Sequence, residues 1–123
     1  MLVSIHHYEL APDASATDFR EAVRTAERRD LFDLPGLVDY RFLRGIKGAR
    51  RGQFTALWYY ESRDAWEAIW GTVEDPVPPA EYPDGWQAWE ELLEPILASD
   101  PDAIDFTTYE VLPSKDGSVA PDR

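Results

Sequence analysis

The stretch that decides the fold is QFTALWYYESRDAWEAIW, residues 53–70. Its first half alternates two sets of side chains, which is the period of a strand with two different faces. One of the two sets consists of Phe54, Ala56, Trp58 and Tyr60. Ser62 then stands at a helix N-cap position, and apolar side chains recur after it at helical spacing up to Trp70. The stretch therefore predicts a strand that leads directly into a short amphipathic helix.

The chain before this stretch predicts a strand, a helix and a second strand. Residues 2–10, LVSIHHYEL, read as a strand because β-branched and aromatic side chains dominate and no turn residue comes before Pro12. Ser15, with Asp18 three residues later, predicts a capped helix that ends before the segment DLPG. A strand follows at residues 37–44, and the glycine-rich loop after it predicts a hairpin with the strand that begins at Gln53.

The chain after the deciding stretch predicts a connection, a helix and a last strand. Residues 75–84 hold four prolines and are expected to form an extended, non-helical connection. Apolar side chains then recur at helical spacing from Asp84 to Pro95, where the regular helix is expected to kink or end. The acidic side chains Glu90, Glu91 and Glu94 are expected on the outer face of this helix. The last strand is predicted at residues 104–112.

This element order predicts an α+β fold, a ferredoxin-like βαββαβ subunit with an antiparallel four-stranded sheet and an extra helix or loop before the last strand. Helices on one side leave the other sheet face bare, and that face carries large side chains on every strand. A second copy is the simplest cover, which gives a dimeric α+β barrel. The domain is expected at residues 1–112, with a mobile C-terminal tail at residues 113–123.

Composition limits the partners and the compartment. A chain of 123 residues with 44% hydrophobic residues is one domain with one core. The net charge of −12 disfavours nucleic acid and anionic membrane, because both attract positive charge. The absence of cysteine excludes disulfides and zinc–thiolate sites. Without a membrane-spanning run or a signal peptide, a cytoplasmic protein is expected.

The acidic surface has two readings. The chain has thirteen Asp and eleven Glu but only two Lys. Excess carboxylates suit high salt, where mutual repulsion is screened, so a halophilic source is one hypothesis. The alternative is a GC-rich genome, which favours Arg over Lys without adaptation to salt.

Several motifs resemble the dimeric α+β barrel superfamily, and within it the antibiotic-biosynthesis-monooxygenase-like domains. These motifs are LAP at the end of the first strand, PGLVDYRFLR, ALWYYESRDAWEA and WEELLEPIL before TYEVL. The resemblance spans roughly residues 2–112. It implies a homodimer with a small-molecule cavity in each subunit, between the sheet and its helices. It also implies one of several activities, among them cofactor-independent monooxygenation of polycyclic phenols and haem degradation.

Haem degradation is disfavoured by the residues themselves. In that branch the haem ligand is a histidine shortly after the second helix, which corresponds here to the stretch DPVPPAEYP. This stretch has no histidine, and His6 and His7 are the only histidines in the chain. These two are adjacent on a strand, so their side chains point to opposite faces and cannot share one metal. No metal site is expected.

The candidate catalytic residue is His6, which the resemblance places toward the cavity. An imidazole with a pKa near ~6.5 can accept a phenolic proton close to neutral pH, so His6 is a candidate general base. The alternative is a hydrogen-bonded interior or interface histidine. The candidate substrate-binding residues are Tyr8, Trp58, Tyr60 and Trp70, which suit a flat apolar or aromatic ligand. Each of them can equally be an ordinary core side chain.

The residues and the resemblance together favour a small-molecule-binding homodimer, and the resemblance implies that it acts as a cofactor-independent monooxygenase on an aromatic or phenolic substrate. No P-loop, dinucleotide glycine motif or Ser-His-Asp order is present, so no cofactor is expected. Two alternatives stay open. One is a non-catalytic ligand-binding or stress-related barrel protein, and the other is an isomerase or cyclase of the same fold.

Overall fold

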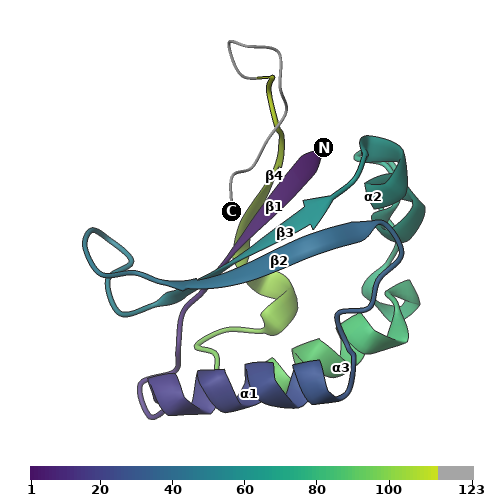
Figure 1. Ribbon diagram of the computed structural model, residues 1–123. Coiled ribbons are helices and arrows are strands. Elements are labelled where there is room, and N and C mark those ends of the chain that lie inside the picture. The colour runs from purple at the N-terminus through teal and green to yellow at the C-terminus, as the bar shows by residue number, and fades with distance from the viewer. Residues whose placement is uncertain (114–123) are drawn as a thin grey trace.

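The computed structural model describes residues 1–113, which form one sheet with helices packed on one of its faces (Figure 1). The strands are β1 (Leu2–Tyr8), β2 (Leu37–Arg44), β3 (Phe54–Tyr60) and β4 (Asp105–Glu110). The helices are α1 (Ala16–Arg28), α2 (Arg63–Trp70) and α3 (Asp84–Leu93), with short 3₁₀ turns η1 (Pro79–Glu81) and η2 (Pro101–Ala103). The tail expected at residues 113–123 lies, apart from its first residue, outside the described residues.

The sheet has the strand order β2-β3-β1-β4, and every neighbouring pair is antiparallel. With helices α1 and α3 below the sheet in Figure 1, this order confirms the predicted ferredoxin-like βαββαβ fold. The register places His6 of β1 opposite Ala56 of β3 and Phe106 of β4. Cross-strand partners share a sheet face, so these three side chains point toward the helices.

Two serines start helices as the sequence predicts. Ser15 accepts a hydrogen bond from the Asp18 amide at 3.2 Å, and the Asp18 carboxylate accepts one from the Ser15 amide at 2.9 Å. This capping box satisfies two amide donors that the first turn of α1 leaves free. Ser62 caps α2 by accepting from the Ala65 amide at 3.1 Å. The end of β3 is thereby fixed directly to the start of α2.

The strand predicted at residues 2–10 is shorter in the structure, because β1 ends at Tyr8. Beyond it, the chain pairs with the segment after α3 instead of continuing the sheet. The Ala98 amide donates to the Glu9 carbonyl at 2.8 Å, and the Ala11 amide donates to the Ile96 carbonyl at 2.9 Å. The last strand is also shorter than the predicted residues 104–112, since Ile104 completes η2. These backbone pairs fasten the end of β1 to the chain that follows α3.

Aromatic side chains dominate the core between the sheet and the helices. Trp58 and Trp89 are fully buried, and the ring of Phe19 on α1 stacks on Phe54 of β3 with centroids 4.3 Å apart. Rings in contact add attraction to the burial of their apolar surface. Helix α3 approaches closely at Gly85, where a Cβ atom would lie 2.6 Å from the Leu31 carbonyl oxygen. Glycine at this position therefore lets α3 pack against the chain that follows α1.

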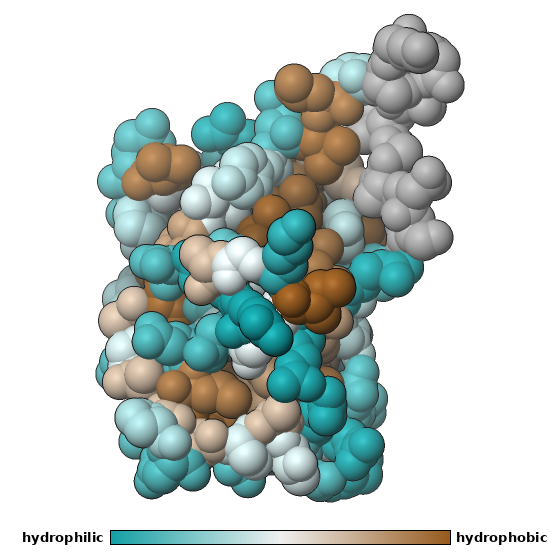
Figure 2. Space-filling model, turned by 90° about the vertical axis from the view of Figure 1, so that its left-hand side faces the viewer, coloured by the Kyte–Doolittle hydropathy of each residue, from teal (hydrophilic) through white to brown (hydrophobic). Residues whose placement is uncertain are grey.

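The opposite sheet face has no helix over it in Figure 1. Val3 of β1 pairs with Tyr59 of β3 and Tyr109 of β4, so all three point to this face. Tyr109 is 49% exposed, and Leu43 of β2 is 44% exposed. On the side of the molecule where the β2–β3 hairpin ends, hydrophobic patches interrupt the hydrophilic surface (Figure 2). Within residues 1–113, no helix combines the length and hydrophobicity needed to cross a bilayer.

Candidate functional site

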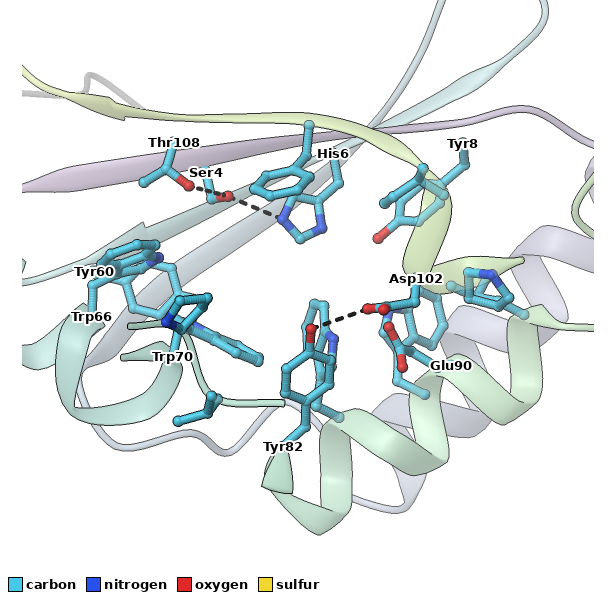
Figure 3. A pocket seen from close by; sticks show the side chains of 18 of the residues that line it. Ser4, His6, Tyr8, Tyr60, Trp66, Trp70, Tyr82, Glu90, Asp102 and Thr108 are labelled. Carbon is cyan, nitrogen blue, oxygen red and sulfur yellow. Dashed lines mark hydrogen bonds between the residues drawn. The ribbon is translucent and has the colours of Figure 1, made fainter. Parts of the chain in front are cut away.

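A cavity of about 440 Å³ lies between the β1–β4 half of the sheet and the chain from α2 to α3 (Figure 3). Helix α1 covers the other half of the sheet, through contacts such as that of Phe19 with Phe54. Strands β1 and β4 supply one wall, α2 another, and α3 with the loop before it the third. Small-molecule sites in proteins have volumes of about 300–1,000 Å³, so the cavity is large enough for a fused-ring ligand.

His6 lies on the sheet wall and is held by a chain of polar contacts. Its Nε2 lies 3.0 Å from Ser4 Oγ, which in turn lies 3.0 Å from Thr108 Oγ1 on β4 (Figure 3). Burial, with a smaller contribution from His7, lowers the pKa of His6 to about 3. The ring is therefore neutral at neutral pH. Its Nδ1 atom is shielded from solvent and has no hydrogen-bond partner in the described part of the chain.

Tyr8 lies beside His6 on the same wall and is fully buried. Its hydroxyl points toward the cavity in Figure 3 and has no hydrogen-bond partner among residues 1–113. Burial raises the pKa of Tyr8, and the indole groups of Trp89 and Trp58 oppose the rise without reaching hydrogen-bond geometry. A buried hydroxyl without a partner costs about 1–3 kcal/mol. The sheet wall therefore offers two polar atoms that a ligand could satisfy.

The opposite side of the cavity is acidic. Glu90 on α3 and Asp102 in η2 both line it, and the Tyr82 hydroxyl donates to Asp102 Oδ1 at 3.1 Å (Figure 3). Burial first, and then the charges of Asp102 and Asp100, raise the pKa of Glu90 to about 7, with the Trp86 indole opposing. Burial and the Asp102 contact raise the pKa of Tyr82 to about 12. Glu90 therefore changes its charge close to neutral pH.

Aromatic rings from β3, α2 and the segment from Tyr82 into α3 line much of the rest of the cavity. The Trp70 indole donates to the Tyr60 hydroxyl at 3.2 Å, and burial raises the pKa of Tyr60 to about 12. The Trp70 ring meets Tyr82 and Trp86 edge to face, with centroids 5.2 Å and 5.4 Å apart. These contacts hold the rings in fixed orientations. The cavity can accordingly accommodate a flat conjugated molecule.

The exposed side chains that line the cavity include Val73 of the α2–α3 connection, which is 68% exposed, and Phe106 of β4, which is 58% exposed. Gly71 and Pro76 pair across this connection, and the Val77 amide donates to the Trp70 carbonyl at 3.0 Å. Four prolines between residues 75 and 84 restrict the backbone further. The α2–α3 connection is therefore a restrained rim of the cavity.

The structure places four of the five candidate residues around the cavity, namely His6, Tyr8, Tyr60 and Trp70. Trp58 does not line it. Its indole is fully buried between Phe32 and Trp86, with its centroid 5.9 Å from that of His6. His7 lies on the other sheet face, where Nδ1 is 3.1 Å from Thr55 Oγ1.

Two acidic residues that line the cavity, Glu90 and Asp102, are not predicted as site residues by the sequence pattern. The helical pattern predicts Glu90 on the outer face of its helix. In the structure it lines the cavity, because one side of α3 packs against the core and the adjacent side borders the cavity. A signal was present, since Glu90 follows Trp86 by one helical turn and therefore borders the apolar stripe. Asp102 gave no such signal, because a 3₁₀ turn places it.

Three solved structures have a fold similar to that of this chain. SnoaB, a cofactor-independent oxygenase from Streptomyces nogalater, is 10% identical and has a TM-score of 0.60, with 93% of this chain and 95% of SnoaB covered. A dimeric ferredoxin-like protein from Thermobifida fusca YX is 13% identical, with a TM-score of 0.59 and 88% of each chain covered.

A Caulobacter crescentus CB15 protein assigned to the antibiotic biosynthesis monooxygenases is 16% identical, with a TM-score of 0.61 and coverage of 90% of this chain and 89% of that one. No protein-family model and no curated protein sequence matches the chain. At these identities the likeness is one of fold.

Proposed function

We propose that this chain, which has the ferredoxin-like fold also found in a cofactor-independent oxygenase, binds a flat aromatic molecule in its cavity and oxidises it with O2 without a cofactor. The observation that carries the proposal is the aromatic cavity into which the unpartnered polar atoms of His6 and Tyr8 are directed. Fold alone does not determine chemistry, so the site has to support the reaction.

The chemistry needs no external reductant when the substrate is a phenol. One atom of O2 enters the ring as a carbonyl oxygen, the other leaves as water, and the substrate supplies all the electrons as it becomes a quinone. The protein binds the ring against Trp70 and Trp86, directs the phenolic oxygen to Tyr8 and His6, and excludes water. His6 accepts the phenolic proton.

The low pKa of His6 sets a condition on this step. A ring with a pKa of about 3 is a weak base in the empty cavity. A phenolate formed beside it stabilises the imidazolium as an ion pair, which raises its basicity while the ligand is bound. The condition is testable, because a phenolic ligand should raise the pKa of His6 whereas an aromatic hydrocarbon of the same size should not.

The bare sheet face supports a homodimer as part of the same proposal. Its apolar side chains include Leu43 and Tyr109, and one fold neighbour is named as dimeric. Two such faces packed about a two-fold axis would cover both and close the barrel. Each subunit keeps its own cavity on the far side of its sheet.

A second function, ligand binding without catalysis, is favoured by the burial of the His6 ring. Burial lowers the pKa of His6 to about 3, as expected for a histidine that only donates or accepts a hydrogen bond. In that function the same cavity supplies affinity and specificity alone.

The test is oxygen uptake in the presence of naphthols and hydroxylated anthracenes, followed by mass spectrometry of products formed under isotopically labelled O2. The expected result is uptake with one labelled oxygen in the product, and a loss of about 100-fold in kcat for His6→Gln, typical of removing a general base. His7→Gln is the matched control, since His7 lies on the other sheet face.

Other outcomes distinguish the alternatives. Saturable binding without uptake or turnover would establish the binding function in place of oxidation. A product of unchanged mass would indicate an isomerase or cyclase, and unchanged turnover in His6→Gln would remove His6 from the mechanism.

A further inference from the structure

The charges around the cavity have one sign. Its ionisable lining groups, besides the tyrosines, are His6, Glu90 and Asp102, and no Lys or Arg lines it within residues 1–113. His6 is neutral at neutral pH. An anionic ligand such as a carboxylate or a phosphate would therefore meet acidic groups without a compensating cation. A neutral or positively charged ligand fits this lining better.

Glu90 and Asp102 lie at the end of the cavity opposite the sheet wall (Figure 3). Across the described chain, every ion pair uses other carboxylates, so neither of these two is neutralised by a Lys or Arg. No group of three or more metal-ligating side chains forms there or elsewhere in residues 1–113. A divalent cation would thus lack ligands, whereas an ammonium group needs only hydrogen-bond acceptors.

Two independent features of the cavity favour a ligand that carries two polar groups. Tyr8 is fully buried and its unpartnered hydroxyl points into the cavity from β1. The carboxylates of Glu90 and Asp102 face the same space from α3 and η2. Trp70, Tyr82 and Trp86 line the same cavity, and aromatic faces pack against flat rings and attract cations.

We infer that the ligand of this cavity is an aromatic compound carrying a basic nitrogen. Its ammonium group binds Glu90 and Asp102, its ring system packs against Trp70 and Trp86, and an oxygen substituent meets Tyr8 and His6. The inference rests on the proposed function, because it specifies the substrate class of the same site. It excludes carboxylated and phosphorylated aromatic compounds as preferred ligands.

The first test uses three probes that share one ring system and differ in charge. Naphthylmethylamine is cationic, naphthalenemethanol is neutral and naphthoate is anionic near neutral pH. Isothermal titration of the full chain at about pH 8 is expected to give a Kd for the amine about tenfold lower than for the alcohol, since a charge-assisted hydrogen bond is stronger than a neutral one. Naphthoate is expected to bind most weakly.

The second test removes the carboxylate. Glu90→Gln is expected to weaken amine binding about tenfold and to leave the alcohol within about twofold of its original Kd. Glu91→Gln removes the same charge from the exposed side of α3 and is the matched control, expected to change neither Kd. Asp102→Asn provides a second variant on a different element, with a smaller loss for the amine because Asp102 is exposed and its charge is more strongly screened by solvent.

The third test follows pH in the unmodified protein and needs no variant. The groups that face Glu90 are Trp86 on its own helix, Asp100 and Asp102 beside η2, Tyr8 on β1, and Tyr82 in the preceding loop. Burial and the neighbouring carboxylates raise the pKa of Glu90 to about 7, so Glu90 gains its negative charge across the neutral range. Amine affinity is therefore expected to rise between about pH 5.5 and about pH 8, whereas alcohol affinity stays constant.

The outcomes separate this inference from the proposed function. If amine and alcohol bind equally, or naphthoate binds best, the ligand class is wrong and the aromatic cavity stands. If none of the three probes binds, both the ligand class and the aromatic-binding function are overturned. An equal loss of amine affinity in Glu90→Gln and Glu91→Gln would mean that the net charge of the protein, and not a contact with Glu90, determines amine affinity. That result would also contradict the inference.

Discussion

Ser4 Oγ lies 3.0 Å from His6 Nε2, two residues further along β1. Side chains two apart on a strand share a face, so one strand supplies both the ring and the group that orients it. Ser4 also contacts Thr108 on β4, which ties the orientation of His6 to the pairing of β1 with β4. The ring therefore has one nitrogen fixed by the sheet and the other, Nδ1, left for the cavity.

The buried neutral ring of His6 makes stability depend on pH on the acid side. Its pKa falls from 6.5 in the unfolded chain to about 3 in the folded one, so between these values only the unfolded chain binds the proton. Stability is therefore expected to fall as pH drops below 6.5. Between about pH 7 and about pH 4.5, the free energy of unfolding of His6→Gln should fall by about 1–2 kcal/mol less than that of the original protein. Urea unfolding at the two pH values measures the difference. Parallel losses in the two proteins would contradict a neutral buried His6.

Glu90 acts in the opposite direction. Its pKa rises from 4.5 to about 7 on folding, so the contribution of this group is fully present below pH 4.5 and is lost as pH rises through 7. Because the group is partly solvated, Glu90→Gln is expected to stabilise the protein by only about 1 kcal/mol at about pH 8, and hardly at all at about pH 4.5. Thermal unfolding at the two pH values measures this difference. Glu91→Gln is the control, and an equal gain there would assign the effect to net charge.

Gly85 is expected to resist substitution by alanine. The added Cβ would lie 2.6 Å from the Leu31 carbonyl oxygen, so α3 or the chain after α1 has to move. The expected cost is about 1–3 kcal/mol, which exceeds the gain of up to about 1 kcal/mol from the better helix propensity of alanine. Urea unfolding of Gly85→Ala measures it, with Glu91→Ala on the exposed side of α3 as a control near zero. A stabilised Gly85→Ala would mean that the two segments are not in contact in solution.

The bare sheet face predicts the effect of charge on assembly. Leu43→Glu combined with Tyr109→Glu puts two carboxylates on that face, which should convert the proposed homodimer into a folded monomer. Sedimentation equilibrium measures the mass, and circular dichroism verifies that the fold persists. Val73→Glu introduces one carboxylate at the rim of the cavity, away from that face, and should leave the dimer intact. A dimer that survives the double substitution would place the interface elsewhere.

The acidic composition predicts a dependence on salt if the halophilic hypothesis is correct. With a net charge of −12, repulsion between carboxylates is screened over about 3 Å at about 1 M salt but over about 10 Å at about 0.1 M. The melting temperature should then fall when the protein is dialysed from high into low potassium chloride. A melting temperature independent of salt would favour the alternative of a GC-rich genome.

Local rules were enough for the elements of the fold but not for the shape of the cavity. The capping residues Ser15 and Ser62 and the alternation in β3 predicted where helices and strands begin, because these signals act over a few residues. Alternation also placed Trp58 on the same face as Tyr60. It does not say that Phe32, from the chain after α1, covers Trp58 while Tyr60 borders open space. That difference depends on where distant segments pack.

The site was only partly predictable for the same reason. His6, Tyr8 and Trp70 lie on a strand and a helix whose faces the sequence shows. Glu90 belongs to a helix with two covered sides, and a single hydrophobic stripe cannot describe two different neighbours. Asp102 is positioned by η2, where no periodic pattern exists. Acidic residues at the border of an aromatic stripe are therefore the signal to examine in similar sequences.

The restrained rim of the cavity, the α2–α3 connection around Val73, has a consequence for the rate of ligand entry. Where a cavity is covered by a loop that opens and closes, the rate of ligand entry is set by the loop. Here prolines and the pairing of Gly71 with Pro76 restrain the covering segment. Entry should instead depend on the cross-section of the ligand, so association rates should fall steeply as fused rings become wider and change little with their length.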